Sequence, residues 1–188
     1  MFKITILYGA VREGRLSIRA VKALQNALQA SGKAEVTLID IKDYNLPVME
    51  ARLKDMSNPS EGLLTISKAL SGADGIILAT PEYNNSYSGA LKNTVDYFTK
   101  EWAKKPIGIC CSSDGIRGGI NASNLLQLLV LAIGAFPMPY KLLVGELPKV
   151  LDENGNVLSE IVKKNIDRFV TEYLWFVEAI NTQHKKPA

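Results

Sequence analysis

Arginines gather in one short segment of the sequence, residues 9–19 (the first loop), which reads GAVREGRLSIR. Arg12, Arg15 and Arg19 fall within eight residues, and guanidinium groups bind phosphate oxygens through paired hydrogen bonds. Ser17 is predicted to be the N-cap of a helix, where free backbone N–H groups also attract anions. Neither the P-loop pattern nor GxGxxG occurs here. The first loop therefore predicts a phosphate site of another kind, unless it is only a solvated basic loop.

Two further segments carry residues suited to a flat, polar ring. The second loop, residues 80–89, reads TPEYNNSYSG. Tyr83 and Tyr87 can lie against a ring, and Asn84 can donate and accept hydrogen bonds at its edge. The third loop, residues 112–119, reads SSDGIRGG, and its glycines expose N–H groups that can surround such an edge. The alternative interpretations are a turn before a helix cap and an ordinary strand-to-helix loop.

Side chains for acid–base or metal catalysis are scarce. His184 is the only histidine and lies in the polar stretch NTQHKKPA, while Cys110 and Cys111 are adjacent and are the only cysteines. Catalytic triads need a positioned histidine, and zinc sites need clustered His and Cys. We therefore expect no triad and no metal site, and we interpret the two cysteines as buried strand residues.

Length and composition bound the class of protein. The chain has 188 residues, a net charge of +3, 47% apolar and 22% charged residues. These values fit one globular domain at residues 1–182, followed by a mobile tail at 183–188. No apolar run approaches the ~20 residues that span a bilayer, and the N-terminus lacks a signal-peptide pattern. We expect a cytoplasmic protein with no membrane partner and, because the positive charge is mild and dispersed, no nucleic-acid partner.

Short apolar runs alternate with amphipathic stretches along the chain. Strands are predicted at 3–8, 35–39, 75–80, 106–111 and 140–144. Helices are predicted at 18–30, 61–71, 88–98, 119–133 and 158–180, the third of them capped by Ser88. This alternation predicts an α/β fold, a flavodoxin-like three-layer sandwich with a five-stranded parallel sheet of order 2-1-3-4-5. The loops after strands 1, 3 and 4 then meet at the topological switch point, where such sheets bind ligands.

Within the second loop and the helix after it, the run ATPEYNNSYSGALKNTVDYF resembles the flavin-contacting motif of the NADPH-dependent FMN reductase family. The first loop is similar to that family's phosphate loop, G-S-x-R-x-x-S, and departs from it at two positions. Ala10 stands where a serine is typical, and Arg15 stands where a small hydroxyl residue is common. The third loop resembles the family's glycine-rich segment, and the similarity extends over roughly residues 3–145.

The resemblance implies bound FMN and assigns roles to the three loops. The phosphate would be held by the basic and hydroxyl residues of the first loop, namely Arg12, Arg15, Ser17 and Arg19. The isoalloxazine ring would be bordered on one side by Pro81, Glu82, Tyr83 and Asn84. Ser112, Ser113, Gly115 and Gly118 would face the ring from the other side. Glu82 has a second interpretation, as a subunit contact.

The implied activity is an FMN-dependent NAD(P)H oxidoreductase. Hydride would pass from NADPH or NADH through FMN to a small acceptor such as a quinone, an azo compound, a metal oxyanion or free flavin. No side chain then has to act as a catalytic acid or base. The alternative is a flavodoxin-like electron-transfer protein, which the net charge of +3 and the arginine-rich first loop disfavour.

The predicted helix 119–133 is apolar on nearly every side, with five leucines between residues 125 and 131. Such a helix is either buried within one subunit or packed against a second subunit. The resemblance favours the second interpretation and implies a homodimer or homotetramer.

Overall fold

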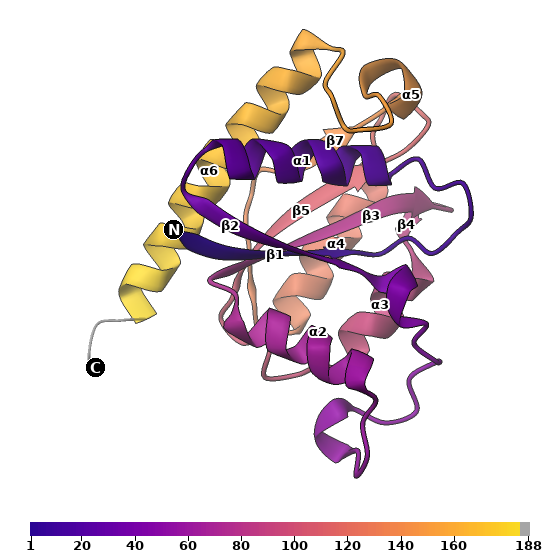
Figure 1. Cartoon of the computed structure of the whole chain (residues 1–188), viewed down its shortest axis with the longest axis vertical. Helices are drawn as coiled ribbons and strands as arrows, with labels where there is room; N and C mark the ends of the chain where they lie inside the picture. The colour runs from indigo at the N-terminus through magenta and orange to yellow at the C-terminus, as the bar shows by residue number, and fades with distance from the viewer. Residues whose placement is uncertain (185–188) are drawn as a thin grey trace.

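The computed structural model describes residues 1–184 and contains one main sheet with helices on both faces (Figure 1). Its strands run in the order β2 (Ala34–Asp40), β1 (Phe2–Tyr8), β3 (Gly75–Tyr83) and β5 (Pro106–Ser112). Both β6 (Phe136–Pro137) and β7 (Leu142–Val144) pair with β5, and all of these pairings are parallel. A two-residue strand, β4 (Ser86–Tyr87), pairs with β3 in the antiparallel sense.

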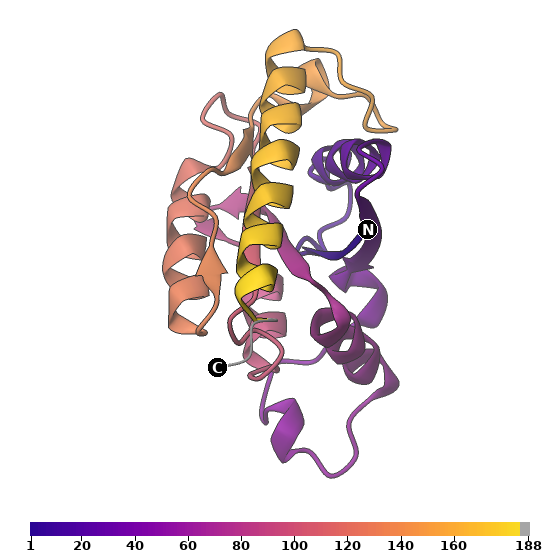
Figure 2. The ribbon, with the colours of Figure 1, turned by 90° about the vertical axis from the view of Figure 1, so that its left-hand side faces the viewer.

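The central strands are buried on both faces, as their continuous apolar sequences require. On one face, α1 (Ile18–Ala30) and α6 (Glu160–His184) pack against β1 and β5. On the other face lie α2 (Glu61–Gly72), α3 (Gly89–Asp96) and α4 (Ile120–Ala132). In Figure 2, α6 runs along much of the long axis of the molecule. The connecting elements are three short helices: η1 (Ile41–Tyr44), η2 (Leu53–Asp55) and α5 (Leu147–Val150).

Close packing of α6 on the sheet depends on a glycine in β5. A Cβ built on Gly108 would lie 3.0 Å from both the Phe169 and the Tyr173 rings. Those two rings stack on each other with centroids 5.8 Å apart, and both side chains are fully buried. The absent side chain at residue 108 therefore lets two aromatic rings lie directly against the strand.

The sequence prediction is confirmed in fold class and needs correction in strand count. The five predicted strands correspond to β1, β2, β3, β5 and β7, and they lie in the predicted relative order. The sheet has seven strands, because β4 and β6 contain only two residues each and produce no periodic pattern. The last helix continues through residue 184, so it includes residues 183 and 184 of the predicted tail; the rest of that tail lies outside the described residues.

Candidate functional site

The three loops meet at the carboxyl ends of β1, β3 and β5, which are neighbours in the sheet. One cavity is lined by residues of all three loops: Arg12, Arg15, Leu16, Ser17, Pro81, Glu82, Tyr83, Ser112, Ser113 and Asp114, together with Leu147 of α5. The predicted site residues Arg19, Asn84, Gly115 and Gly118 are not among its lining residues. Leu16, Asp114 and Leu147 were missed, and Leu147 carried no sequence signal because the four-residue α5 was not predicted.

Backbone donors of the first loop are available to a ligand. Within the described part of the chain, no N–H of residues 10–17 donates to another protein atom. Ser17 has helical backbone angles, φ −59° and ψ −18°, and its side chain makes no capping hydrogen bond. Ser17 therefore occupies the predicted N-cap position of α1, but its hydroxyl contacts Tyr8 and does not cap the helix. The N–H groups at this end of α1 stay open to an anion.

Arg15 is held by the protein itself. Both terminal nitrogens of its guanidinium donate to the Asp40 carboxylate at the end of β2, one of them over 2.6 Å. The same guanidinium donates to the Ala10 carbonyl and lies over the Tyr8 ring, 4.9 Å from its centroid. The adjoining carboxylate raises the pKa of Arg15 above its usual value, so the ion pair persists at any physiological pH. This bidentate pair fixes the first loop against the ends of β1 and β2.

The other two arginines of the first loop point to different places. Arg19 donates to the Leu151 carbonyl over 3.1 Å and lies 3.7 Å from the Glu153 carboxylate, so its contacts are with the segment after α5. The Arg12 guanidinium lies over the Tyr83 ring, 5.5 Å from its centroid, and the side chain is exposed at the rim of the cavity. Within residues 1–184, Arg12 is the one of the three that forms no ion pair with a carboxylate.

Ser17 shares its hydroxyl with a buried tyrosine. The Tyr8 hydroxyl and Ser17 Oγ are 2.6 Å apart, and either can donate. Burial raises the pKa of Tyr8 from 10.0 to about 12, so the phenol keeps its proton. Tyr8 is thus in contact with two residues of the first loop, Ser17 through its hydroxyl and Arg15 through its ring.

The second loop is a tight β-hairpin. Asn84 and Asn85 both have positive φ, 49° and 63°, and they form the two-residue connection between β3 and β4. This is the pattern of a type I′ turn, which asparagine tolerates well. Two adjacent asparagines are a hairpin signal, and the sequence prediction had no hairpin at this position.

Contacts with α4 hold the hairpin in place. Glu82 Oε2 accepts a hydrogen bond from the Ala122 N–H over 3.0 Å, in the first turn of α4. Asn121 donates to the Asn85 side chain over 3.0 Å. Because the N-cap position of α4 is Gly119, which has no side chain, Glu82 supplies the missing acceptor. The carboxylate that was predicted to border a ligand therefore also caps a helix.

Serine and glycine residues connect the loops to one another. Ser88 Oγ accepts from the Leu91 N–H over 3.1 Å, which confirms Ser88 as the cap of α3, and it donates to the Gly9 carbonyl. In the third loop, Ser113 N–H donates to the Val144 carbonyl over 3.1 Å. A Cβ on Gly118 would lie 2.8 Å from the Val144 nitrogen. Gly118 thus allows the third loop to pack against β7.

The cysteines contribute no reactive thiol. Cys110 and Cys111 are free and buried in β5. Burial raises the pKa of Cys110 to about 12 and raises that of Cys111 well above its usual value. Both thiols are therefore protonated and shielded. The prediction that the two cysteines are buried strand residues is confirmed.

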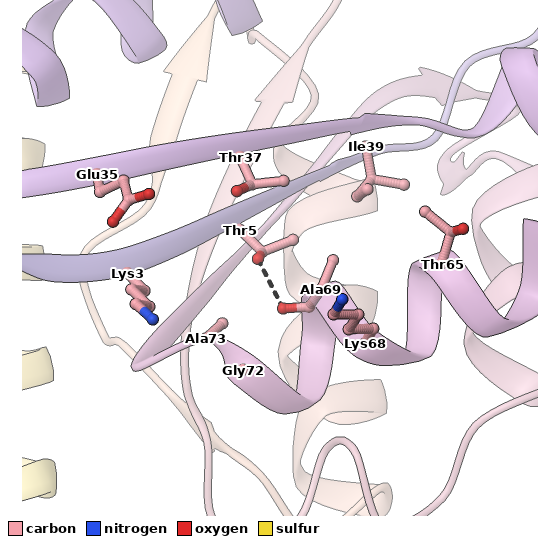
Figure 3. Close-up of a pocket in the computed structure, with 10 residues that line it drawn as sticks. All are labelled: Lys3, Thr5, Glu35, Thr37, Ile39, Thr65, Lys68, Ala69, Gly72 and Ala73. Carbon is pink, nitrogen blue, oxygen red and sulfur yellow. Dashed lines mark hydrogen bonds between the residues drawn. The ribbon is translucent and has the colours of Figure 1, made fainter.

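A separate hollow lies along β1 and β2 and shares no lining residue with the cavity of the three loops. Figure 3 shows its lining residues on those strands and on α2. Its volume is about 420 Å³. Ala69, Gly72 and Ala73 line its helix side, and Thr5 donates to the Ala69 carbonyl over 3.0 Å. The hollow exists because these small residues leave space beside the edge strand β2, and it contains none of the predicted site residues.

Comparison with known proteins decides the family. Residues 2–148 match the model of a family described as NADPH-dependent FMN reductase. The chain belongs to this family. The predicted fold, the predicted oxidoreductase class, and FMN and NAD(P)H as cofactors are therefore confirmed at the level of the family. None of the helices described here is both long and apolar enough to cross a bilayer.

Individual relatives of this FMN reductase family member support the same class. The chain is 31% identical to an NADPH azoreductase of Bacillus sp. (strain OY1-2), over 69% of this chain and 77% of that one. It is 24% identical to a quinone reductase of Escherichia coli K12, over 95% and 96% of the two chains. Among solved structures, the flavoenzyme NAD(P)H:(acceptor) oxidoreductase FerB of Paracoccus denitrificans is similar, with a TM-score of 0.81 and 25% identity over 95% of this chain and 98% of that one.

Proposed function

We propose that this FMN reductase family member binds FMN at the meeting point of its three loops and uses it to pass hydride from NADPH or NADH to a small acceptor. The observation that carries this proposal is the convergence of the first, second and third loops on one cavity. The cavity measures about 110 Å³, whereas sites that enclose a whole ligand have roughly 300–1,000 Å³. A bound FMN would therefore extend from the cavity over the surface of the loops.

The first loop fits the phosphate end of FMN. Its open N–H groups at residues 10–17 and the exposed guanidinium of Arg12 offer several donors to one anion. Ser17 lines the same cavity and adds a hydroxyl donor. We assign the phosphate to these groups. Arg15 and Arg19 are assigned supporting roles, because their guanidiniums already contact Asp40 and the segment after α5.

The second and third loops fit the ring. Pro81, Glu82 and Tyr83 form one wall of the cavity, and Ser112 and Ser113 form another. Asn84 lies at the hairpin turn beside Tyr83, so we assign it to the ring edge through its backbone and amide. Gly115 and Gly118 shape the third loop: the Gly115 carbonyl accepts from Ser113 Oγ over 3.0 Å, and Gly118 packs against β7.

Bound FMN supplies the redox chemistry, accepting hydride and releasing electrons to the second substrate. The protein's share is binding, orientation and charge stabilisation. Backbone N–H groups of the second and third loops near the ring edge would favour the negative charge of the reduced cofactor. The site needs no side chain as a proton donor, which fits the absence of histidine from the cavity lining.

The acceptor is a small, electron-poor molecule. Relatives of this chain carry the names azoreductase, quinone reductase and 2-hydroxy-1,4-benzoquinone reductase, so quinones and azo compounds are the first substrates to test. Metal oxyanions and free flavin are further candidates.

We also propose that residues 1–182 form one FMN-binding domain. We place the protein in the cytoplasm, because its two cysteines are free thiols, as is usual in a reducing compartment.

We also propose that the protein is a homo-oligomer, a dimer or a tetramer, assembled through α4. Leu125, Leu128 and Leu131 are 41%, 63% and 60% exposed and lie on the outer side of this helix. They recur at a spacing of three residues, so they form one apolar surface. A second copy of the chain is the occupant that the family resemblance favours.

One experiment tests the central proposal. The protein is purified without added cofactor, its visible spectrum is recorded, and NADPH is added without oxygen. We expect a flavin spectrum that bleaches, after which a quinone restores it. A flavin that remains oxidised would instead support electron transfer from a protein donor. A colourless protein that fails to bind added FMN would overturn the proposal.

A further inference from the structure

Tyr8 occupies an unusual position for a core tyrosine. It is the last residue of β1 and is fully buried, yet its polar and aromatic parts both contact the first loop. The hydroxyl lies 2.6 Å from Ser17 Oγ, and the ring lies beneath the Arg15 guanidinium at 4.9 Å. No sequence pattern marked this residue, because in the sequence it is one apolar position of a buried strand.

The hydroxyl contact sets the direction of the Ser17 proton. Two hydroxyl groups can share one hydrogen bond in either sense. If Ser17 donated to Tyr8, the lone pairs of Ser17 Oγ would face the cavity and repel an anion. If Tyr8 donates, the Ser17 O–H is free to donate into the cavity that Ser17 lines. The raised pKa of Tyr8 keeps its proton available for this second arrangement.

The ring contact concerns Arg15. The guanidinium lies over the Tyr8 ring, and both of its terminal nitrogens donate to the Asp40 carboxylate. A cation over an aromatic face, paired with a carboxylate, is balanced in charge and fixed in place. Arg15 therefore stabilises the shape of the first loop and has few donors left for a ligand.

We propose that Tyr8 is a positioning residue for the phosphate of FMN: its hydroxyl orients the Ser17 O–H toward the phosphate, and its ring, with Asp40, holds Arg15 as a brace of the first loop. This inference rests on the proposed binding of FMN. Tyr8 does not touch the cofactor in this arrangement and acts only through Ser17 and Arg15.

The test compares FMN with riboflavin, which lacks the phosphate. Both are titrated into apo-protein, and dissociation constants are measured from flavin fluorescence for the wild type, Tyr8→Phe, Ser17→Ala and the double variant. We expect Tyr8→Phe to weaken FMN binding about fivefold to tenfold, the effect of losing one oriented hydrogen bond. Riboflavin binding should be unchanged. In the Ser17→Ala background, Tyr8→Phe should have no further effect on FMN.

Several outcomes would overturn the inference. Unchanged FMN affinity in Tyr8→Phe would remove the role of the hydroxyl. Equal losses for FMN and riboflavin, or additive losses in the double variant, would show a general structural role. The control is Tyr140→Phe, at another tyrosine whose ring lies under an arginine, Arg168, at 4.3 Å. If the wild type binds neither flavin, the proposed function fails rather than this inference.

A second comparison tests the brace. Arg15→Gln and Arg12→Gln are measured for the ratio of FMN to riboflavin affinity and for thermal stability. We expect Arg12→Gln to lower the ratio about tenfold with little change in Tm. Arg15→Gln should lower Tm and change the ratio by less than threefold. If the ratio of FMN to riboflavin affinity falls as much in Arg15→Gln as in Arg12→Gln, Arg15 is a phosphate ligand and its role as a brace is overturned.

Discussion

Some side chains of the first loop are assigned to the ligand and others support the loop, and Tyr8 contacts one residue of each kind. It contacts Ser17, which lines the cavity, and Arg15, which is paired with Asp40. Arg15 and Asp40 lie 25 residues apart in the sequence and meet only because β2 is the neighbour of β1. The arginine that departs from the family pattern is thus explained by a partner on the next strand.

Tyr8 should leave a signature in the alkaline stability of the protein. Its pKa is raised from 10.0 to about 12 by burial, so folding favours the neutral phenol. A phenol with a raised pKa makes its full contribution to the free energy of unfolding below about pH 10, and this contribution is lost as the pH rises to about 12. We expect the free energy of unfolding to fall less over this window in Tyr8→Phe than in the wild type, by about 2–3 kcal/mol. Urea unfolding at several pH values measures it, and parallel curves for both proteins would contradict it.

Glu82 should contribute to stability even without cofactor, because it caps α4. The Ala122 N–H loses its acceptor in Glu82→Ala, and a buried helix end without an acceptor costs about 0.5–2 kcal/mol. We expect that loss in urea unfolding of the apo-protein. Glu13→Ala, at an exposed carboxylate of the first loop, is the matched control and should change stability by less than about 0.5 kcal/mol. Equal effects of the two variants would exclude the capping role.

At the level of elements, β5 and α6 are held at close range by a glycine. In Gly108→Ala, the added methyl group would lie 3.0 Å from the Phe169 and Tyr173 rings. The two rings have little room to move away, because they are buried and stacked. We expect a destabilisation of about 1–3 kcal/mol, measured by thermal or urea unfolding. Gly72→Ala, at the end of α2 where no atom lies within 4 Å of the new Cβ, should be neutral or stabilising. A neutral Gly108→Ala would mean that α6 shifts easily on the sheet.

The elements that sequence could predict are those with a long periodic pattern. The strands β1, β2 and β5 and the helices α1 and α2 lie within two residues of their predicted ends, and β3 continues three residues beyond its predicted end. The short elements β4, β6 and α5 contain two to four residues, too few for a period to appear. The meeting of the three loops was predictable because parallel strands end at one edge.

The detailed contacts of the site were not predictable in the same way. Arginine at residues 12, 15 and 19 has the same chemistry in the sequence, and only the folded chain separates them. Arg15 meets Asp40, Arg19 meets Leu151 and Glu153, and Arg12 remains at the cavity rim. The capping of α4 by Glu82 likewise joins residues 40 positions apart. Pairings of this kind depend on tertiary structure, which local propensity does not encode.

For the whole molecule, α4 links the cofactor site to the proposed subunit interface. Its first turn holds the hairpin through Glu82 and Asn85, and its outer side presents the exposed leucines. A second subunit packed on those leucines would fix α4 and, through it, the loop assigned to the ring. Assembly and cofactor binding are therefore expected to support each other.

A charge placed on the outer side of α4 should separate the subunits. Leu128 is 63% exposed in the single chain, so Leu128→Glu should fold normally, but in an assembly it would bury a carboxylate without a partner. We expect a wild-type mass of two or four chains by light scattering and a mass of one chain for Leu128→Glu, with unchanged circular dichroism. Leu158→Glu, at a leucine 61% exposed outside α4, is the matched control and should keep the wild-type mass. A monomeric wild type would refute the interface, and dissociation by Leu158→Glu alone would move it away from α4.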